Sequence, residues 1–148
     1  MKVSSRVDYA MSCLIVIAQE HDKGIPVPVK KVAAREALEV DYVEQLLIQL
    51  KRAGILKSVR GIKGGYLLTR DPEDITTLEI LRAFEGEILE LVCFRKKGRK
   101  SACIHLEECE LRRFWIEMGE VMEEYLARNT LRYLVELRAK EKTKGEYL

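Results

Sequence analysis

The segment that decides the fold is Asp41–Thr69, DYVEQLLIQLKRAGILKSVRGIKGGYLLT. Up to Ala53 its apolar residues recur every three or four positions, which is the period of an amphipathic helix, and Gly54 then ends the pattern. From Ile55 the period changes to two, and a glycine-rich run over Gly61–Gly65 separates two short alternating stretches. The segment therefore predicts a helix that is followed directly by a β-hairpin.

The residues before this segment predict two further helices, over about residues 6–20 and 29–36. Capping boxes are expected where the first and third helices begin, namely Ser5 with Asp8 and Asp41 with Glu44. The third helix is expected to have a polar outer stripe of Tyr42, Gln45, Gln49 and Arg52. Two short helices joined by a tight turn have the spacing of a helix-turn-helix, and the hairpin beside them predicts a winged helix.

The second half of the chain predicts more helix. Thr76 with Glu79 has the spacing of a capping box for a helix that Gly86 ends. A longer helix is expected over about 108–127, with an apolar face of Leu111, Phe114, Trp115, Met118, Val121, Met122, Tyr125 and Leu126. Because a compact winged helix does not need such a length, this helix is expected to pair with a second copy, and a final helix follows from Leu131.

We therefore predict a mainly α fold with a small β-hairpin wing and a long dimerisation helix. The expected division is a winged helix-turn-helix over 1–86, a cysteine-bearing sensor loop over 87–107, and a dimerisation helix with a C-terminal helix over 108–148. The chain has 148 residues, 47% of them hydrophobic and 34% charged, as expected for one soluble domain. Neither a membrane-spanning run nor a signal peptide is recognisable, so a cytoplasmic protein without a membrane partner is expected.

The charge is unevenly distributed, although the net charge is only +2. The stretch Lys51–Arg70 contains six Lys and Arg residues and no acid, and a second basic run covers Arg95–Lys100. Basic segments on a nearly neutral chain indicate a localised anionic partner, of which nucleic acid is the leading candidate. Motifs typical of catalysis, such as a nucleophile elbow, a zinc-protease helix or a dinucleotide fingerprint, are missing from the sequence, so an enzyme is not expected.

The hairpin turn carries the most specific signal for nucleic acid. Arg60 and Lys63 flank its tip and could enter a minor groove or bind phosphates, while Gly64 and Gly65 allow the backbone to come close to a surface. The alternative is an ordinary charged hairpin. A nucleotide-cradling loop is disfavoured because neither a Lys-Ser/Thr pair nor a helix follows the glycines.

Three of the four cysteines, Cys93, Cys103 and Cys109, fall within one stretch, whereas Cys13 stands apart among apolar residues. In a reducing compartment such cysteines are thiols or metal ligands more often than disulfides. Three thiolates with one His or Asp suit zinc, and thiolates also bind iron-sulfur clusters. Cys13 is expected to pack in the core.

The ordered motifs resemble the Rrf2 family of bacterial transcription regulators, in its IscR and NsrR group. The similarity runs through RVDYA at 6–10, DYVEQLL at 41–47, LKRAGILKSVRG at 50–61, GGYLL at 64–68 and ILRAFEG at 80–86, and reaches the three cysteines. It implies a homodimeric winged-helix repressor or activator whose long helix forms the dimer interface. In many members an iron-sulfur cluster is the sensor, which implies a redox-sensing regulator.

By this resemblance the third helix enters the major groove of a pseudo-palindromic duplex operator and the hairpin reaches the flanking minor groove. Glu44 matches a family position that reads bases, in addition to its expected capping role, and Arg60 matches the wing arginine. Asp41 replaces a small hydroxyl residue, and Ile62-Lys63 replaces the usual Pro-Gly. The expected DNA-binding residues are Tyr42, Glu44, Gln45, Gln49, Arg52, Arg60, Lys63, Gly64 and Gly65.

The resemblance also implies a 2Fe–2S or 4Fe–4S cluster on Cys93, Cys103 and Cys109, although nine residues separate the first two, which is more than in cluster-binding relatives. Asp8 matches the carboxylate that completes the cluster from the partner subunit in the nitric-oxide-sensing branch, and His105 is a competing fourth ligand. Zinc is the alternative metal. The rival functions are a cluster-free regulator that senses thiol oxidation or zinc, and a small metal-carrying or electron-transfer protein, which would not account for the basic hairpin.

Overall fold

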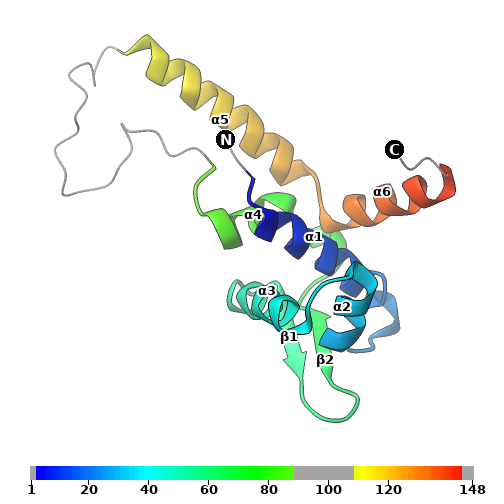
Figure 1. The fold of residues 1–148 in the computed structure, drawn as a ribbon. Helices are drawn as coiled ribbons and strands as arrows, with labels where there is room; N and C mark the ends of the chain where they lie inside the picture. The colour runs from blue at the N-terminus through cyan, green and yellow to red at the C-terminus, as the bar shows by residue number, and fades with distance from the viewer. Residues whose placement is uncertain (1–2, 89–108, 145–148) are drawn as a thin grey trace, which may run out of the picture.

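The computed structural model describes residues 3–88 and 109–144. Over these ranges the chain is mainly helical with one antiparallel two-stranded hairpin, as the sequence predicts. Figure 1 shows the helices grouped above the hairpin, with one long helix extending away from the group. The elements are α1 (Ser5–Ala18), α2 (Val29–Glu36), α3 (Val40–Arg52), β1 (Leu56–Val59), β2 (Gly65–Leu68), α4 (Thr77–Glu85), α5 (Glu110–Arg128) and α6 (Leu131–Lys144), with one-turn 3-10 helices at His21–Lys23 (η1) and Pro72–Asp74 (η2).

The core is built around α1, which packs against α2, α3, α4 and α6. On α3 the buried residues are apolar ones that recur every three or four positions, whereas on α1 the whole run Cys13–Ala18 is buried. Leu14 and Ile17 of α1 and Leu46, Leu47 and Leu50 of α3 have essentially no exposed surface. This shared apolar layer holds the helix-turn-helix together, because burying each such side chain stabilises the fold by about 1.5–3 kcal/mol.

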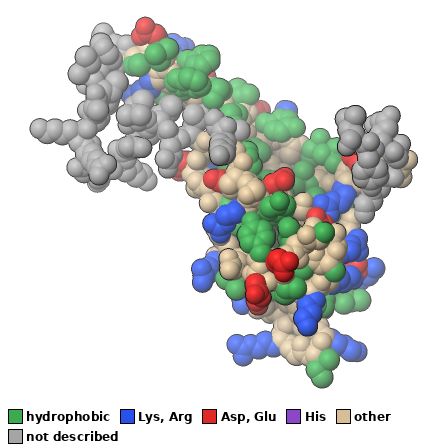
Figure 2. Space-filling view, in the orientation of Figure 1, with side chains coloured by type: hydrophobic (Ala, Val, Ile, Leu, Met, Phe, Trp, Pro, Cys, Tyr) green, Lys and Arg blue, Asp and Glu red, His purple; other side chains and the backbone are tan. Residues whose placement is uncertain are grey.

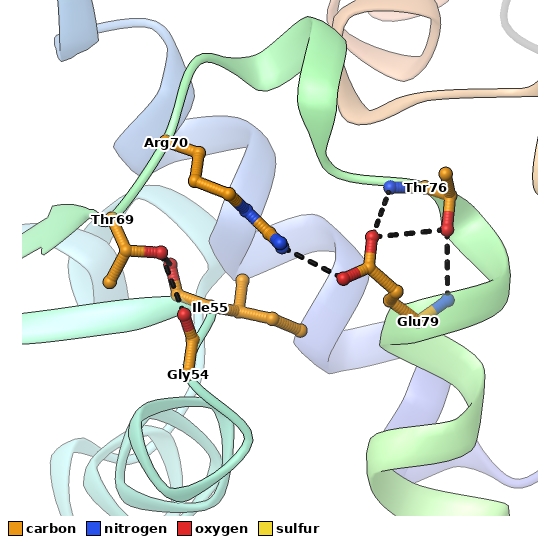
Figure 3. Close-up of polar contacts among 6 residues, drawn as sticks. All are labelled: Gly54, Ile55, Thr69, Arg70, Thr76 and Glu79. Atoms are coloured by element: carbon orange, nitrogen blue, oxygen red, sulfur yellow. Dashed lines mark hydrogen bonds and ion pairs between the residues drawn. The ribbon is translucent and has the colours of Figure 1, made fainter.

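The predicted wing is the antiparallel pair of strands β1 and β2. Their register runs from Leu56 opposite Leu68 to Val59 opposite Gly65. Val27, which precedes α2, extends the ladder with two backbone hydrogen bonds of 2.9 Å to Tyr66. This contact explains Gly65, whose added Cβ would lie 2.4 Å from the Val27 carbonyl, with φ at +154°. The carbonyl oxygens of Gly54 and Ile55, before β1, accept hydrogen bonds from the Thr69 hydroxyl just after β2, at 2.6 and 3.2 Å (Figure 3).

Two of the three predicted capping boxes are wrong. Helix α1 begins at Ser5 with Ser4 as its N-cap, and α3 begins at Val40 with Glu39 as its N-cap. Neither N-cap side chain accepts a hydrogen bond from the first turn of its helix. Ser5 and Asp41 therefore already lie inside their helices, where a side chain no longer faces the free N–H groups. The box at α4 is confirmed: the Glu79 backbone donates to the Thr76 hydroxyl at 3.2 Å, and the Thr76 backbone donates to Glu79 at 3.0 Å (Figure 3).

Helices α5 and α6 contact this core to different extents. The C-terminal part of α5 packs on α4, where the Thr77 hydroxyl donates to the Leu126 carbonyl at 2.8 Å and Arg82 pairs with Glu123 at 2.7 Å. The remainder of α5 extends away from the other helices (Figure 1). After Asn129 the chain turns, and α6 packs back against the domain with Leu131 fully buried. Within the described ranges, the helices are too short or too polar to cross a membrane.

Candidate DNA-binding surface and cysteine segment

Helix α3 presents one exposed face, made of five residues that are spaced by three, one, three and four positions. These residues lie on one side of the helix, opposite the buried leucines. They combine hydrogen-bond acceptors, donors, an apolar surface and a cation, which are the groups that read base edges in a major groove. The exposed residues of this face are Asp41, Glu44, Gln45, Ile48 and Arg52.

The spacing of Glu44 from Asp41 predicted a capping box at the start of α3, but this capping box does not form. Its side chain is exposed, and it lies near Tyr66 of the hairpin: burial, and secondly the charge of Glu44, raise the pKa of the Tyr66 hydroxyl. The carboxylate is thus available at the junction of α3 and the wing, where it can accept a hydrogen bond from the N4 amino group of a cytosine.

Two predicted contact residues of α3 lie away from the exposed face. Tyr42 is half-buried, and its ring packs edge-on against that of Tyr9, with centroids 6.0 Å apart. The Gln49 side chain accepts a hydrogen bond from Arg6 at 2.6 Å and donates one to the Ala83 carbonyl at 2.8 Å. Gln49 is therefore engaged with α1 and α4, and the structure does not bring it together with the exposed residues of α3.

The wing supplies the cations. Arg60 and Lys63 are exposed, and Figure 2 shows Lys and Arg side chains projecting on both sides of the hairpin at the lower end of the molecule. Gly64 packs inside the turn, since an added Cβ would lie 2.3 Å from the Val59 carbonyl oxygen. Gly64 and Gly65 are thus required by the hairpin and by its contact with Val27, whereas the sequence analysis assigned them to a close approach to DNA. The backbone of the tip remains exposed at Gly61, whose φ is +111°.

Two exposed isoleucines were missed by the sequence analysis. Ile48 is 37% exposed in the middle of the polar face of α3, and Ile62 is completely exposed at the tip of the wing. A signal for Ile48 is present in its position three residues after Gln45 and four before Arg52, but the predicted outer stripe did not include it. Exposed apolar side chains at these places can contact thymine methyl groups or sugar edges.

The cysteine segment is described in part. Cys93, Cys103 and His105 lie outside the described residues. Cys109 is half-buried at the N-terminus of α5, where its carbonyl accepts from the backbone of Arg112 and Arg113 while its thiol does not cap the helix. Asp8 is exposed in the first turn of α1. Residues 3–88 and 109–144 contain no group of three potential metal ligands.

Cys13 is in the core, as its apolar neighbours predict. Its side chain is fully buried, and burial raises the pKa of its thiol to about 12, with Glu36 adding to the rise and Arg138 opposing it. Such a thiol stays protonated and is not a ligand or nucleophile at neutral pH.

The predicted apolar face of α5 is partly used within the chain, because Met122 and Leu126 pack against the buried cluster of Val7, Leu81 and Ile88. Most of the other apolar side chains of this face are exposed. The helix has 19 residues, and none of them is buried. Phe114 and Trp115 pack edge-on against each other, with centroids 5.1 Å apart, yet both remain exposed. The exposed apolar residues are Leu111, Phe114, Trp115, Val121 and Tyr125. A row of this kind on an extended helix is typical of a surface that another chain covers.

Comparison with known proteins agrees with this fold. The family model Rrf2, an iron-dependent transcriptional regulator, matches residues 3–137. The HTH-type regulator CymR of Bacillus subtilis is 34% identical over 131 residues, 88% of this chain and 87% of that protein. The regulator IscR of Xenorhabdus nematophila is 30% identical over 135 residues, 91% of this chain and 79% of that protein.

Solved structures of relatives have the same architecture. The structure of B. subtilis CymR, described as a global cysteine regulator, is similar with a TM-score of 0.73 at 30% identity, covering 93% of this chain and 98% of that one. The structure of T. potens IscR has a TM-score of 0.70 at 30% identity, with 100% and 94% coverage. These are regulators of transcription and not enzymes. The chain belongs to the Rrf2 family of DNA-binding transcriptional regulators and has its winged helix-turn-helix fold.

Proposed function

We propose that the chain acts in the cytoplasm as a homodimer that binds a pseudo-palindromic duplex operator, and that an iron-sulfur cluster controls this binding. The observation that carries the proposal is the exposed polar face of α3 next to a hairpin whose turn exposes the cations Arg60 and Lys63. In this arrangement 1–86 is the DNA-binding unit, 87–107 the sensor segment, and 108–148 the dimerisation unit, although α6 shares the core of the first unit.

The proposed DNA contacts follow from the chemistry of the exposed groups. The face of α3 enters the major groove, where Glu44 accepts from cytosine N4, Gln45 pairs with adenine, and Ile48 contacts a thymine methyl group. Arg52 binds phosphate, and the wing places Arg60 and Lys63 in the flanking minor groove. A dimer would present two such surfaces about one helical turn of DNA apart, roughly 34 Å.

The exposed apolar row of α5 supports the homodimer. Its residues are spaced as on one side of a long helix, so a second copy of α5 can bury them by antiparallel or parallel packing. The Val121 side chain, for example, is 67% exposed. Its contact with water is unfavourable and would be removed if a partner chain covered it.

Cys109 is the described residue on which the fit of a cluster can be tested. It is half-buried at the N-terminus of α5, and its thiol is not used for capping the helix. The proposed ligands are Cys93, Cys103 and Cys109, with Asp8 from the partner subunit or His105 as the fourth. Asp8 is exposed and, among the described residues, its carboxylate makes no hydrogen bond or ion pair, so it is available to a second chain. A bound 2Fe–2S or 4Fe–4S cluster would supply sensitivity to oxidants or nitric oxide.

A second candidate is a regulator of the same fold that senses thiol oxidation or zinc without a cluster. The long gap between Cys93 and Cys103 favours this candidate. The similarity to CymR, which is described as a global cysteine regulator, also favours it. Zinc would use the same thiolates with one His or Asp in a tetrahedral site.

The cofactor is tested by purifying the protein without oxygen and measuring its absorption spectrum, iron, sulfide and zinc. A cluster predicts a brown protein with iron and sulfide that the variant Cys109→Ala loses, whereas Cys13→Ala, the matched buried cysteine, keeps both. Asp8→Ala should leave a coloured dimer with a less stable cluster or an altered response in DNA binding. A colourless protein with stoichiometric zinc, or with neither metal, would favour the second candidate.

A further inference from the structure

The side chain of Gln49 connects three helices. Its Oε1 accepts a hydrogen bond from Nη2 of Arg6 on α1 at 2.6 Å, and its Nε2 donates one to the carbonyl oxygen of Ala83 on α4 at 2.8 Å. The Arg6 guanidinium also lies 5.7 Å from the centroid of the Phe84 ring, on the same turn of α4. Both ends of the Gln49 amide are thus occupied by groups of the protein.

The Ala83 carbonyl has a physical need for this donor. It lies in the last turn of α4, which ends at Glu85, and the last four carbonyls of a helix have no donor within the helix. Gln49 satisfies one of them from a different helix. A half-buried carbonyl without a donor is unfavourable, so the contact is stabilising as well as specific.

The remaining contacts of α3 with the other helices are mainly apolar. Val43, Leu46, Leu47 and Leu50 hold the helix by burial, whose free energy does not depend on the alignment of a donor and an acceptor. Hydrogen bonds require alignment of donor and acceptor and become weak when it is lost. The two bonds of Gln49 are therefore suited to fix the angle at which α3 presents its exposed face.

We propose that Gln49 is a positioning residue for DNA recognition, which sets the orientation of α3 through Arg6 and Ala83 and does not touch the duplex. This inference rests on the proposed function, because it assumes that the exposed face of α3 reads an operator. It assigns to Gln49 a role that differs from a base contact, and it adds Arg6 of α1 to the residues on which recognition depends.

The test uses the full chain and an operator fragment selected by the wild-type protein from genomic DNA. Gln49→Met keeps the length of the side chain and removes both hydrogen bonds. It should weaken operator binding about tenfold, equally for operators with different single-base changes, and leave binding to random duplex unchanged. Arg6→Met should give a similar loss, and the double variant should be no worse than the weaker-binding single variant, because both remove one connected unit.

Two further variants separate positioning from general damage to the fold. Gln49→Glu keeps an acceptor for Arg6 but no donor for Ala83, so it should recover part of the lost affinity. Gln19→Met removes a glutamine whose Oε1 accepts from Arg35 at 3.0 Å on the surface, and should bind the operator within about twofold of wild type. Thermal unfolding of each variant shows whether it is folded at the temperature of the binding assay.

Two results would overturn the inference while the proposed function stands. One is a Gln49→Met protein that binds the operator as tightly as wild type. The other is a loss of discrimination at a single base pair only, which would make Gln49 a base-reading residue. If the wild-type protein itself preferred no genomic fragment, the proposed function would fail, and the positioning role of Gln49 would fail with it.

Discussion

Arg138 near the end of the chain is bound to Glu36 of the helix-turn-helix. Its two guanidinium nitrogens donate to the two carboxylate oxygens at 2.6 and 3.4 Å, and the side chains are only 24% and 14% exposed. Because charge-assisted pairs of this kind are directional, the contact fixes α6 against α2. The C-terminal helix is consequently packed against the helix-turn-helix and is not only an extension of α5.

Replacing Arg138 by Ala is expected to lower the free energy of unfolding by about 1–3 kcal/mol, since Glu36 would lose its partner in a mostly buried place. The matched control is Arg113→Ala, which removes an exposed pair with Glu117 on α5 and should lower the free energy of unfolding much less. Urea unfolding followed by circular dichroism, at one protein concentration, measures both. Equal effects of the two substitutions would show that the pair does not stabilise the packing of α6.

Arg60→Ala is expected to weaken operator binding. If Arg60 reads the minor groove, specific affinity should fall by about 1–3 kcal/mol while binding to random duplex changes less. Fluorescence anisotropy at several salt concentrations distinguishes this from a phosphate contact, for which both affinities fall together and the salt dependence becomes shallower. Lys140→Ala removes an exposed cation of α6, on the opposite side of the domain from the wing, and should have little effect. Similar losses from both substitutions would mean that only overall charge matters.

Val121→Asp is expected to convert the dimer to a monomer, because it places a charge in the middle of the exposed apolar row of α5. Analytical ultracentrifugation at micromolar concentration measures the mass, and operator binding should weaken in parallel. Glu120→Ala changes the neighbouring exposed residue, which points away from that row, and should leave the dimer intact. A monomeric wild-type protein, or a dimeric Val121→Asp variant, would contradict the assignment of α5 as the interface.

Stability at high pH should depend on Cys13. Its thiol has an ordinary pKa of 9.0, and burial, followed by the charge of Glu36, raises that pKa to about 12 in the folded chain. Below pH 9 both states keep the proton; between pH 9 and 12 the unfolded chain loses it first, so the free energy of unfolding falls as pH rises, by up to about 1.4 kcal/mol per pH unit. Cys13→Ala should show a correspondingly flatter dependence in urea titrations over this window. Identical slopes for the two proteins would mean that Cys13 does not contribute.

The sequence predicts most of the fold because local periodicity determines it. The second helix, α2, and the strands of the hairpin were located closely, since the change of period at Gly54 and the glycine-rich turn are local signals. The capping boxes predicted at Ser5 and Asp41 were wrong, because a Ser or Asp three residues before an acid can also lie inside a helix, as both do here. At Thr76 the same spacing coincides with an extended N-cap residue, and there the prediction holds.

The remaining features depend on contacts between distant residues. Gln49 meets Arg6, 43 residues away, and Ala83, 34 residues away, so its helical position alone placed it on the outer stripe of α3. Gly65 is required because Val27 passes beside it, a contact that no local pattern indicates. Ile48 shows the opposite case, because its spacing from Gln45 and Arg52 was visible in the sequence and yet the predicted outer stripe did not include it.

The central claim is that two copies of the chain recognise a specific duplex sequence through α3 and the wing, under the control of a cysteine-bound iron-sulfur centre. The most direct measurement incubates anaerobically purified, iron-replete protein with fragmented genomic DNA and excess random duplex, and sequences the retained fragments. We predict enrichment of fragments that share a pseudo-palindrome, with an affinity that changes when the cluster is removed by oxidation or chelation. Retention of no fragment above the random competitor would contradict the claim of specific recognition, and an affinity unaffected by cluster removal would contradict the claim of control.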